Sequence, residues 1–362
     1  EVLEQINVWP PLNEPDVSVV MPEDEHEAKI IKSLVDMVKI EKFKDRKNSY
    51  PHLVHPLSVT HYLQKAGSSF LSQCAGILHD YVEELVDCNI EKMRLDNSSE
   101  NFSFFDMVET QLLIGLEEDL DSVFSNGPVS GAYPDNITET VRLLTRHKRH
   151  RYYASINGIF SCEEQETRDA AIKVKLADRT HNILTLDSFN EQQALYQCFK
   201  NLFILNEAKK YLRATNQLSD GGSQMTPAEK LFRKCGKATY GALWFITEKA
   251  KTKVITNKRD SASHAVLTLD MAFQKFDKIY KGLEKVTRPD PQESHPMRLF
   301  QGVVLKYDSH LHKDGKEYKR RNRDELKYCS SLFKSNNLSY DQIKALVVFK
   351  DAFSLREVMG HL

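Results

Sequence analysis

Apolar residues recur at spacings of three and four along several stretches of the chain, which is the pattern of helices with one buried face. The first such stretch runs from residue 24 to 43. The same periodicity predicts helices over residues 57–65, 69–85, 137–151, 168–186 and 191–214, and later over 227–251 and 265–286. Only residues 299–307 look strand-like. The pattern therefore predicts a mostly α protein with a largely helical C-terminal extension.

Proline, glycine and polar residues divide these helices into regions. A proline-rich N-terminal arm covers residues 1–23, and the Ser-Asp-Gly-Gly-Ser run at 219–223 marks a flexible break. Residues 97–136 are polar and turn-rich, with one short helix predicted near 105–120, and we interpret them as an insertion. The sequence thus predicts a first domain over residues 24–216 and a second over 217–362.

Composition excludes several functional classes. The 50 basic and 51 acidic residues give a net charge of -1, so nothing global indicates a nucleic-acid partner. No apolar run approaches the roughly 18 residues that span a bilayer. The six cysteines form no C-x-x-C pair, which predicts a reducing, cytoplasmic location. No signal peptide is visible, although a chain that starts at Glu1 leaves a removed leader open.

Three short segments contain the residues that could bind a metal or take part in catalysis. They run from Arg46 to Pro56 (RKNSYPHLVHP), from Leu78 to Glu84 (LHDYVEE) and from Lys175 to Asn182 (KLADRTHN). A lone His-Asp pair on a helix is usually structural, a histidine before proline is ordinary in loops, and Asp or Asn commonly cap helices. Because the three segments each lie on or beside a predicted helix, their combination favours one shared site.

Imidazole and carboxylate ligands together suit a first-row metal such as Mn, Fe, Zn or Co. His79 and Asp80 are neighbours on a predicted helix and can hold one ion between them if other helices add ligands. Glu83 and Glu84 follow one turn after His79 and Asp80, where a carboxylate could deprotonate a metal-activated water. This spacing is compatible with a metal site that activates water as a nucleophile, and equally with an ordinary structural role for these residues.

Residues 25–215 resemble the hydrolase domain of RelA/SpoT homologues, within the HD superfamily. That pattern has an Arg-Lys pair, a proline-containing loop, His-Pro, then His-Asp-x-x-Glu-Asp, and later Lys-Leu-Ala-Asp-Arg-x-His-Asn. The resemblance implies an HD-type helical bundle. It also implies a manganese-dependent reaction that removes pyrophosphate from the 3′ position of guanosine tetra- or pentaphosphate, the alarmones of the stringent response.

The resemblance also implies a role for each matching residue. Metal ligation would fall to four residues, water activation to an acidic pair, and substrate binding to three more. These are His55, His79, Asp80 and Asp178 for the metal, Glu83 and Glu84 for catalysis, and Arg46, Lys47 and Asn182 for the base, the phosphates and the sugar.

The chain departs from the family pattern at four points. Glu84 replaces an aspartate, Leu184 stands where many members have arginine, and His52 replaces a tyrosine. The interval from Asp80 to Asp178 is also longer than usual, as the insertion at 97–136 would require. Such an insertion would serve either as a lid over the site or as a surface for a partner.

Other features leave alternatives open. The basic run at 142–151 is either a solvated helix end or a phosphate-facing rim, and a second basic stretch at 313–323 is more simply an exposed loop than an RNA contact. Residues 220–362 show no match to the alarmone-synthesising domain of long family members. The second domain is therefore expected to be regulatory, structural or a surface for homo-oligomerisation.

Three functions remain open from the sequence. The first is a 3′-pyrophosphohydrolase of guanosine alarmones, favoured by Arg46 and Lys47 because a guanidinium can stack on a purine. The second is an HD phosphatase acting on another nucleotide, such as the 2′-phosphate of NADPH or an adenosine analogue. The third is a non-catalytic module that senses a nucleotide.

Overall fold

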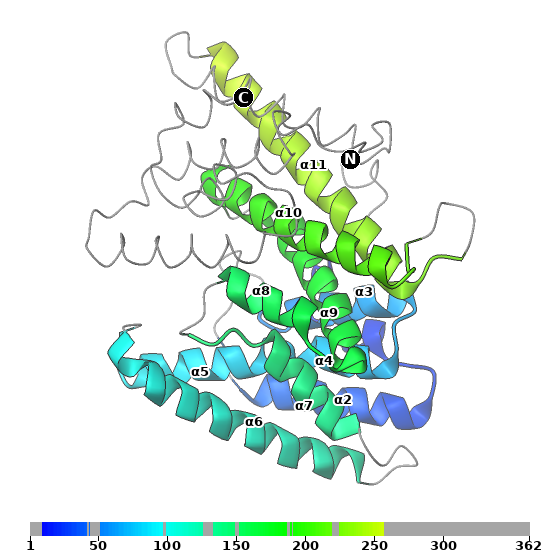
Figure 1. The fold of residues 1–362 in the computed structure, drawn as a ribbon, viewed down its shortest axis with the longest axis vertical. Coiled ribbons are helices and arrows are strands. Elements are labelled where there is room, and N and C mark those ends of the chain that lie inside the picture. The colour runs from blue at the N-terminus through cyan, green and yellow to red at the C-terminus, as the bar shows by residue number, and fades with distance from the viewer. Residues whose placement is uncertain are drawn as a thin grey trace. The chain divides into compact units, whose positions relative to one another are not determined.

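The computed structural model describes residues 9–41, 43, 51–96, 99–125, 133–148, 152–186, 189, 191–218 and 224–256. Every regular element in these ranges is a helix (Figure 1), which confirms the mostly α prediction. None of these helices combines the length and apolarity needed to cross a bilayer. The predicted helix at 265–286, the strand-like run at 299–307 and the basic stretch at 313–323 lie outside the described residues.

The helices follow one another along the chain as Figure 1 labels them. Their bounds are η1 Val17–Val20, α2 Glu25–Ile40, α3 Val54–Ala66, α4 Phe70–Leu78, α5 Tyr81–Lys92, η2 Ser99–Asn101, α6 Phe102–Phe124, α7 Tyr133–Leu144, α8 Tyr152–Ser161, α9 Gln165–Leu184, α10 Glu191–Ala214 and α11 Pro227–Thr256.

Contacts within the chain define two compact units. One unit contains Trp9–Thr185 together with Asn206–Cys235, and every candidate site residue that the structure describes belongs to it. The other contains Leu186–Leu205 and the chain from Gly236 onward, where the buried Asn201 amide donates to the Thr239 hydroxyl. The domain boundary predicted after residue 216 stays a prediction.

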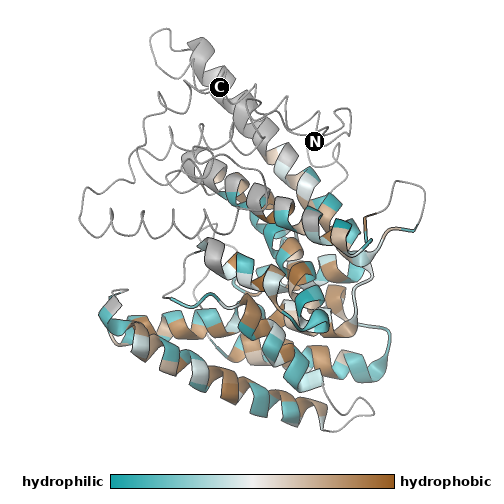
Figure 2. Ribbon diagram, viewed as in Figure 1, coloured by the Kyte–Doolittle hydropathy of each residue, from teal (hydrophilic) through white to brown (hydrophobic). Residues whose placement is uncertain are grey.

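The first unit forms because its helices carry apolar stripes that need a common core. In α2 the Asp24 side chain accepts hydrogen bonds from the backbone N–H groups of His26 and Glu27, which caps the start of the helix. Apolar residues at helical spacing then bury one face of α2. Figure 2 shows the same two-sided distribution along α6. The stripes meet in one core, whose members include Ile31, Leu34, Leu57, Leu78, Val82, Leu116, Leu120 and Val141.

A close approach of α3 and α4 sets the geometry of the site. Helix α3 ends at Gly67, whose φ of 80° is the left-handed conformation that glycine adopts without strain. Gly76 in α4 faces α3 so tightly that a Cβ there would lie 2.5 Å from Leu63 Cδ1 and 3.2 Å from Thr60 Oγ1. Glycine at position 76 therefore allows α3, which contains His55, to pack closely against α4, which ends just before His79.

The structure corrects three details of the predicted elements. The single helix predicted over 69–85 is two helices, α4 and α5, separated at His79 and Asp80. The insertion is largely one 23-residue helix, α6, because Leu113, Leu116 and Leu120 give it a buried face. The helix predicted over 137–151 is α7, which begins earlier, at Tyr133, and ends at Leu144, so that Arg142 is the only basic residue of the basic run that lies in it.

Candidate metal centre

Three separate segments contribute two imidazoles and two carboxylates, of which His55, His79 and Asp80 form the closest group. His55 lies in the first turn of α3, next to Pro56, which is tolerated there because the first helical N–H groups need no partner within the helix. His79 ends α4, Asp80 precedes α5, and Asp178 lies in the middle of α9. His55, His79 and Asp178 are buried, whereas the Asp80 side chain is 31% exposed. The cluster therefore opens toward solvent at Asp80.

The donor atoms of the four side chains are in close proximity. His55 Nε2 is 3.0 Å from His79 Nε2, 3.3 Å from Asp80 Oδ2 and 3.4 Å from Asp178 Oδ1. His79 Nε2 is 3.2 Å from Asp80 Oδ2. His55, His79 and Asp80 thus bring their donor atoms within 4.8 Å of one another, and Asp178 adjoins this group through His55.

These separations fit a single metal ion. Two ligand atoms that each bind a first-row metal at about 2.1 Å are about 3.0 Å apart at a right angle and about 3.4 Å apart at a tetrahedral angle. The observed donor separations of 3.0 to 3.4 Å fall in this interval. Nitrogen and carboxylate oxygen donors are also the mixture that Mn, Fe, Zn and Co accept.

The second nitrogen of each imidazole is held by the protein. His79 Nδ1 lies 2.8 Å from the carbonyl oxygen of Gly76, to which it donates. That donation places the imidazole proton on Nδ1 and leaves Nε2 as the ligating atom. His55 Nδ1 is 2.8 Å from Nδ1 of the buried His181, one turn along α9 from Asp178. Both rings are thereby fixed in orientation before any ion binds.

Basic and amide groups hold the carboxylate of Asp178. Lys175 Nζ lies 2.9 Å from Asp178 Oδ2, and the amide of Asn182 donates to Asp178 Oδ1. Burial opposes ionisation of Asp178, but Lys175 together with His55 and His79 outweighs burial and holds the pKa of Asp178 well below its usual range. The same ion pair raises the pKa of Lys175 despite its burial. Asp178 is therefore ionised, as a metal ligand must be.

The pKa values of Asp80 and His79 are also shifted by their neighbours in the cluster. Burial opposes ionisation of Asp80, but the imidazoles of His79 and His55 hold the pKa of Asp80 well below its usual range. Burial likewise opposes protonation of His79, but the Asp80 carboxylate raises the pKa of His79. The centre attracts positive charge, which is the property that binding of a divalent cation requires.

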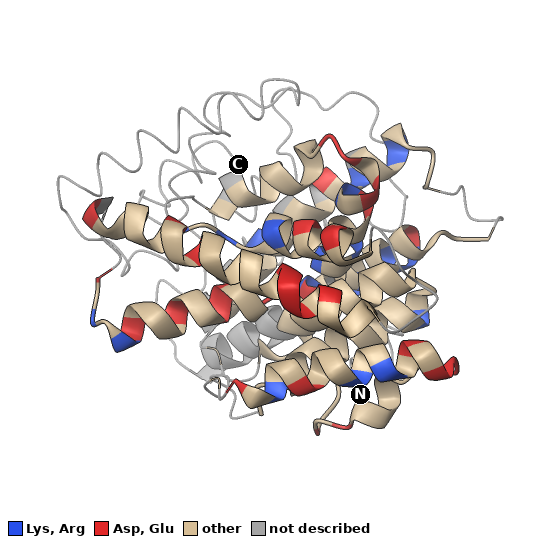
Figure 3. Ribbon diagram, turned by 90° about the horizontal axis from the view of Figure 1, so that it is seen from below, with Lys and Arg blue, Asp and Glu red and all other residues tan. Residues whose placement is uncertain are grey.

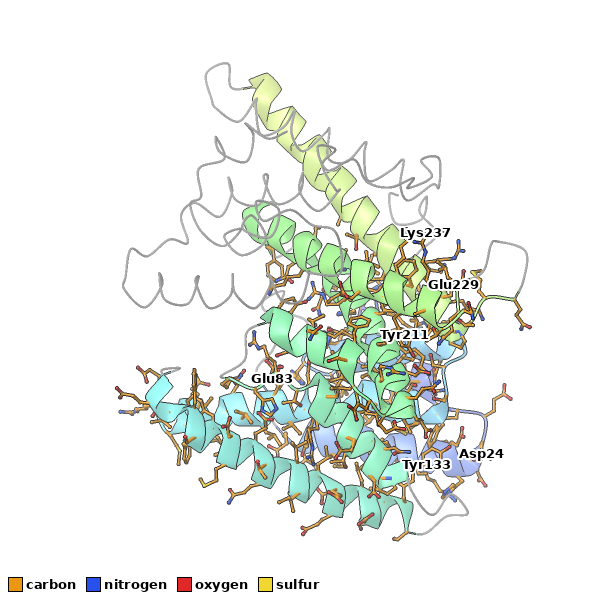
Figure 4. All side chains as sticks on the ribbon, in the orientation of Figure 1. Asp24, Glu83, Tyr133, Tyr211, Glu229 and Lys237 are labelled. Carbon is orange, nitrogen blue, oxygen red and sulfur yellow. The ribbon has the colours of Figure 1, made fainter. Side chains whose placement is uncertain are left out.

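Glu83 occupies the first turn of α5, where Figure 4 labels it. The backbone N–H of Arg146 is 3.4 Å from Glu83 Oε2, and the Arg146 guanidinium is 3.3 Å from Oε1. Lys148 Nζ lies 3.9 Å from the same Oε1 and 2.5 Å from Asp87 Oδ1. Arg146 and Lys148 of the basic run therefore ion-pair with α5, and a phosphate-facing role for that run stays a prediction.

The remaining sequence-predicted residues have varied positions. Glu84 follows Glu83 in α5, and its backbone N–H donates to the Asp80 carbonyl. Arg46 and Lys47 lie outside the described residues. The side-chain amide of Asn182 donates to Asp178, and its contact with a nucleotide sugar stays a prediction.

No individual role was predicted from the sequence for four residues of the site: Lys175, His181, Arg146 and Lys148. Lys175 and His181 stand three residues before and after Asp178, on the same side of a helix. That spacing was a signal for contact with the metal ligand. No comparable signal linked the basic run to Glu83, because the two are 63 residues apart.

Comparisons with known proteins point toward enzymes of guanosine polyphosphates. No protein-family model matches the chain, and no solved structure matches it. A GTP pyrophosphokinase from Myxococcus xanthus is 26% identical over 187 residues, which are 51% of this chain and 20% of that protein. A guanosine-3′,5′-bis(diphosphate) 3′-pyrophosphohydrolase from Borreliella burgdorferi is 26% identical over 164 residues, which are 45% of this chain and 20% of that protein.

These two matches support a relation to RelA/SpoT-type enzymes. The aligned region spans about a fifth of the length of each relative. One relative is named for synthesis and the other for hydrolysis, so the names alone do not assign an activity to this chain.

Proposed function

We propose that this chain is a metal-dependent 3′-pyrophosphohydrolase of guanosine tetra- and pentaphosphate, which releases GDP or GTP and pyrophosphate. The observation that carries the proposal is the cluster of His55, His79 and Asp80, whose donor atoms lie 3.0 to 3.3 Å apart, with Asp178 Oδ1 3.4 Å from His55 Nε2. The name of the Borreliella burgdorferi relative supports the same substrate class. We propose Mn²⁺ as the resident ion.

The ligand geometry assigns a role to each supporting residue. The Gly76 carbonyl and His181 orient the two imidazoles, and Lys175 and Asn182 fix Asp178. A bound divalent ion would act as a Lewis acid toward the phosphate and lower the pKa of water. Ligands that are already oriented lose little conformational freedom on binding, so the site favours tight binding of a single ion.

In the proposed reaction, the carboxylate of Glu83 accepts a proton from the attacking water and later returns it to the leaving group. The bond between the 3′ oxygen and its phosphorus breaks, the hydroxyl of water joins that phosphorus, and the proton ends on the 3′ oxygen. Arg146 holds Glu83 through two contacts, which orient the carboxylate for this transfer. Glu84 supports Glu83 from the next position in α5.

Substrate recognition is proposed at three residues. Arg46 stacks on the guanine, Lys47 contacts the base and phosphates, and Asn182 reaches the sugar from beside Asp178. Stacking of a guanidinium on a purine favours binding of a nucleotide over that of a generic phosphate ester. The contact between Asn182 and Asp178 ties recognition of the sugar to the order of the metal centre.

A substrate panel tests the proposal. The purified chain would be incubated with Mn²⁺ and guanosine tetraphosphate, its adenosine analogue or NADPH, and pyrophosphate and orthophosphate would be measured separately. Rapid pyrophosphate release from the guanosine compound, absent in Asp178→Asn, is the expected result. Orthophosphate release from NADPH without turnover of guanosine tetraphosphate would replace the proposal with an NADPH phosphatase. Nucleotide binding without any turnover would replace it with a sensing module.

A further inference from the structure

A buried carboxylate in the inserted helix lies outside the proposed metal centre. Glu109 of α6 is 3% exposed, although its helix forms part of the outer layer of the unit (Figure 3). Its Oε1 atom is 2.7 Å from Nδ1 of His147, whose side chain is 37% exposed. A charged group in such surroundings strongly destabilises a protein unless it is paired, so this contact has a structural purpose.

The partner of Glu109 stands between the two residues that contact Glu83. Arg146 and Lys148 direct their side chains to α5, whereas His147 directs its side chain to α6. These three consecutive residues follow the end of α7 and belong to no helix. The short segment from residue 145 to 148 is therefore fixed from two sides, with Glu109 as its attachment on α6.

We propose that Glu109 is a positioning residue that acts through His147 to keep Arg146 and Lys148 on Glu83. By this arrangement the inserted helix is coupled to the candidate site and sets the orientation of the acid–base carboxylate. The kinetic consequence rests on the proposed function, whereas the coupling itself does not. The inference gives the insertion a role other than that of a lid or a docking surface.

The charges around His147 favour this arrangement. The hydrogen bond to Glu109 raises the pKa of His147, and the nearby Arg142 of α7 opposes that effect. Arg146 and Lys148, which flank His147 in the chain, pair with Glu83 and Asp87 on α5. His147 thus pairs with the buried Glu109 carboxylate of α6. Its neighbours Arg146 and Lys148 pair with the Glu83 and Asp87 carboxylates of α5.

The first test measures the coupling without any substrate. Glu109→Gln removes the charge and keeps the shape, and Glu118→Gln is the matched control, because Glu118 is an exposed residue of the same helix. Amide hydrogen exchange would be followed in residues 145–148 of the full chain. We expect exchange to accelerate at least tenfold in Glu109→Gln and to stay unchanged in Glu118→Gln. Equal protection in both variants would overturn the proposal.

The second test measures the consequence for turnover of guanosine tetraphosphate. Glu109→Gln is expected to lower kcat about tenfold while KM and Mn²⁺ content stay within twofold of the parent. In an Arg146→Gln background the same substitution should lower kcat no further, because it acts through Arg146. A merely structural role would instead give losses that multiply, and that result would overturn the assignment.

His147→Gln provides a second route if Glu109→Gln fails to fold, because it cuts the same contact from a partly exposed position. It should reproduce both the faster exchange and the lower kcat. If the parent chain turns over no guanosine tetraphosphate, the proposed function fails, and the exchange test alone decides the coupling. Faster exchange with an unchanged kcat would refute the positioning role and leave only a structural contact.

Discussion

Replacing Lys175 by methionine should destabilise the metal-free chain much more than the metal-loaded chain. Lys175 Nζ is 2.9 Å from Asp178 Oδ2, and the two side chains are only 17% and 5% exposed. At an effective dielectric constant of about 20, such a pair attracts by about 6 kcal/mol, most of which desolvation offsets. Removing one partner of a buried pair nevertheless costs about 3–5 kcal/mol, since the other charge stays buried. The partial exposure of Lys175 places our expectation near 3 kcal/mol.

The metal dependence of this loss follows from the position of Asp178. Its Oδ1 atom lies 3.4 Å from His55 Nε2, among the proposed ligands, so a bound cation would replace the missing ammonium as the partner of the carboxylate. Urea unfolding of Lys175→Met and the parent would be measured in chelator and in saturating Mn²⁺. We expect the difference in unfolding free energy to fall from about 3 kcal/mol to below about 1 kcal/mol. A loss under 0.5 kcal/mol in chelator, or one that Mn²⁺ leaves unchanged, would refute the reasoning.

Three further predictions follow from other contacts. Glu83→Gln should keep Mn²⁺ content and KM but lower kcat by roughly 10²- to 10⁴-fold, and parental turnover in steady-state assays would exclude Glu83 as the acid–base group. Gly76→Ala should destabilise the chain by about 1–3 kcal/mol in urea unfolding, because its Cβ would lie 2.5 Å from Leu63 Cδ1, and a smaller loss would show that α3 and α4 can separate. Glu109 raises the pKa of His147, so the stability advantage of the parent over His147→Gln should be complete below about pH 6.5 and disappear as pH rises through that raised pKa. An advantage that grows with pH would contradict this sign.

The sequence predicted the helices well where a single stripe of apolar residues decided the outcome. The helix at 191–214 has the predicted bounds, and α2 and α9 differ from prediction by a few residues at their ends. The break at His79 and Asp80 escaped prediction because both flanking helices carry apolar residues in phase, and no glycine or proline marks the turn. Helix α6 was underestimated because polar, turn-rich residues flank it on both sides and gave the whole of 97–136 the composition of an insertion.

For the candidate site, the sequence predicted the motif residues but not the contacts that support them. Motifs predicted four metal ligands, of which His55, His79 and Asp80 lie together with Asp178 next to His55, and their binding of a metal stays a prediction. Their supporting contacts depend on packing between distant helices, which one sequence does not reveal. Glu83 illustrates the difference: its spacing from His79 predicted an acid–base group, but its ion pairs with Arg146 and Lys148 arise from a segment more than sixty residues away.

The most direct test of the account is to count and locate Mn²⁺ in the purified full-length chain. Crystals grown with Mn²⁺ would be examined by anomalous scattering, and calorimetry would measure stoichiometry in solution. The account predicts one ion per chain, bound by His55, His79, Asp80 and Asp178 at about 2.1 to 2.2 Å, and loss of binding in Asp178→Asn. A chain that binds no Mn²⁺ or other first-row divalent ion at these four residues would contradict the central claim.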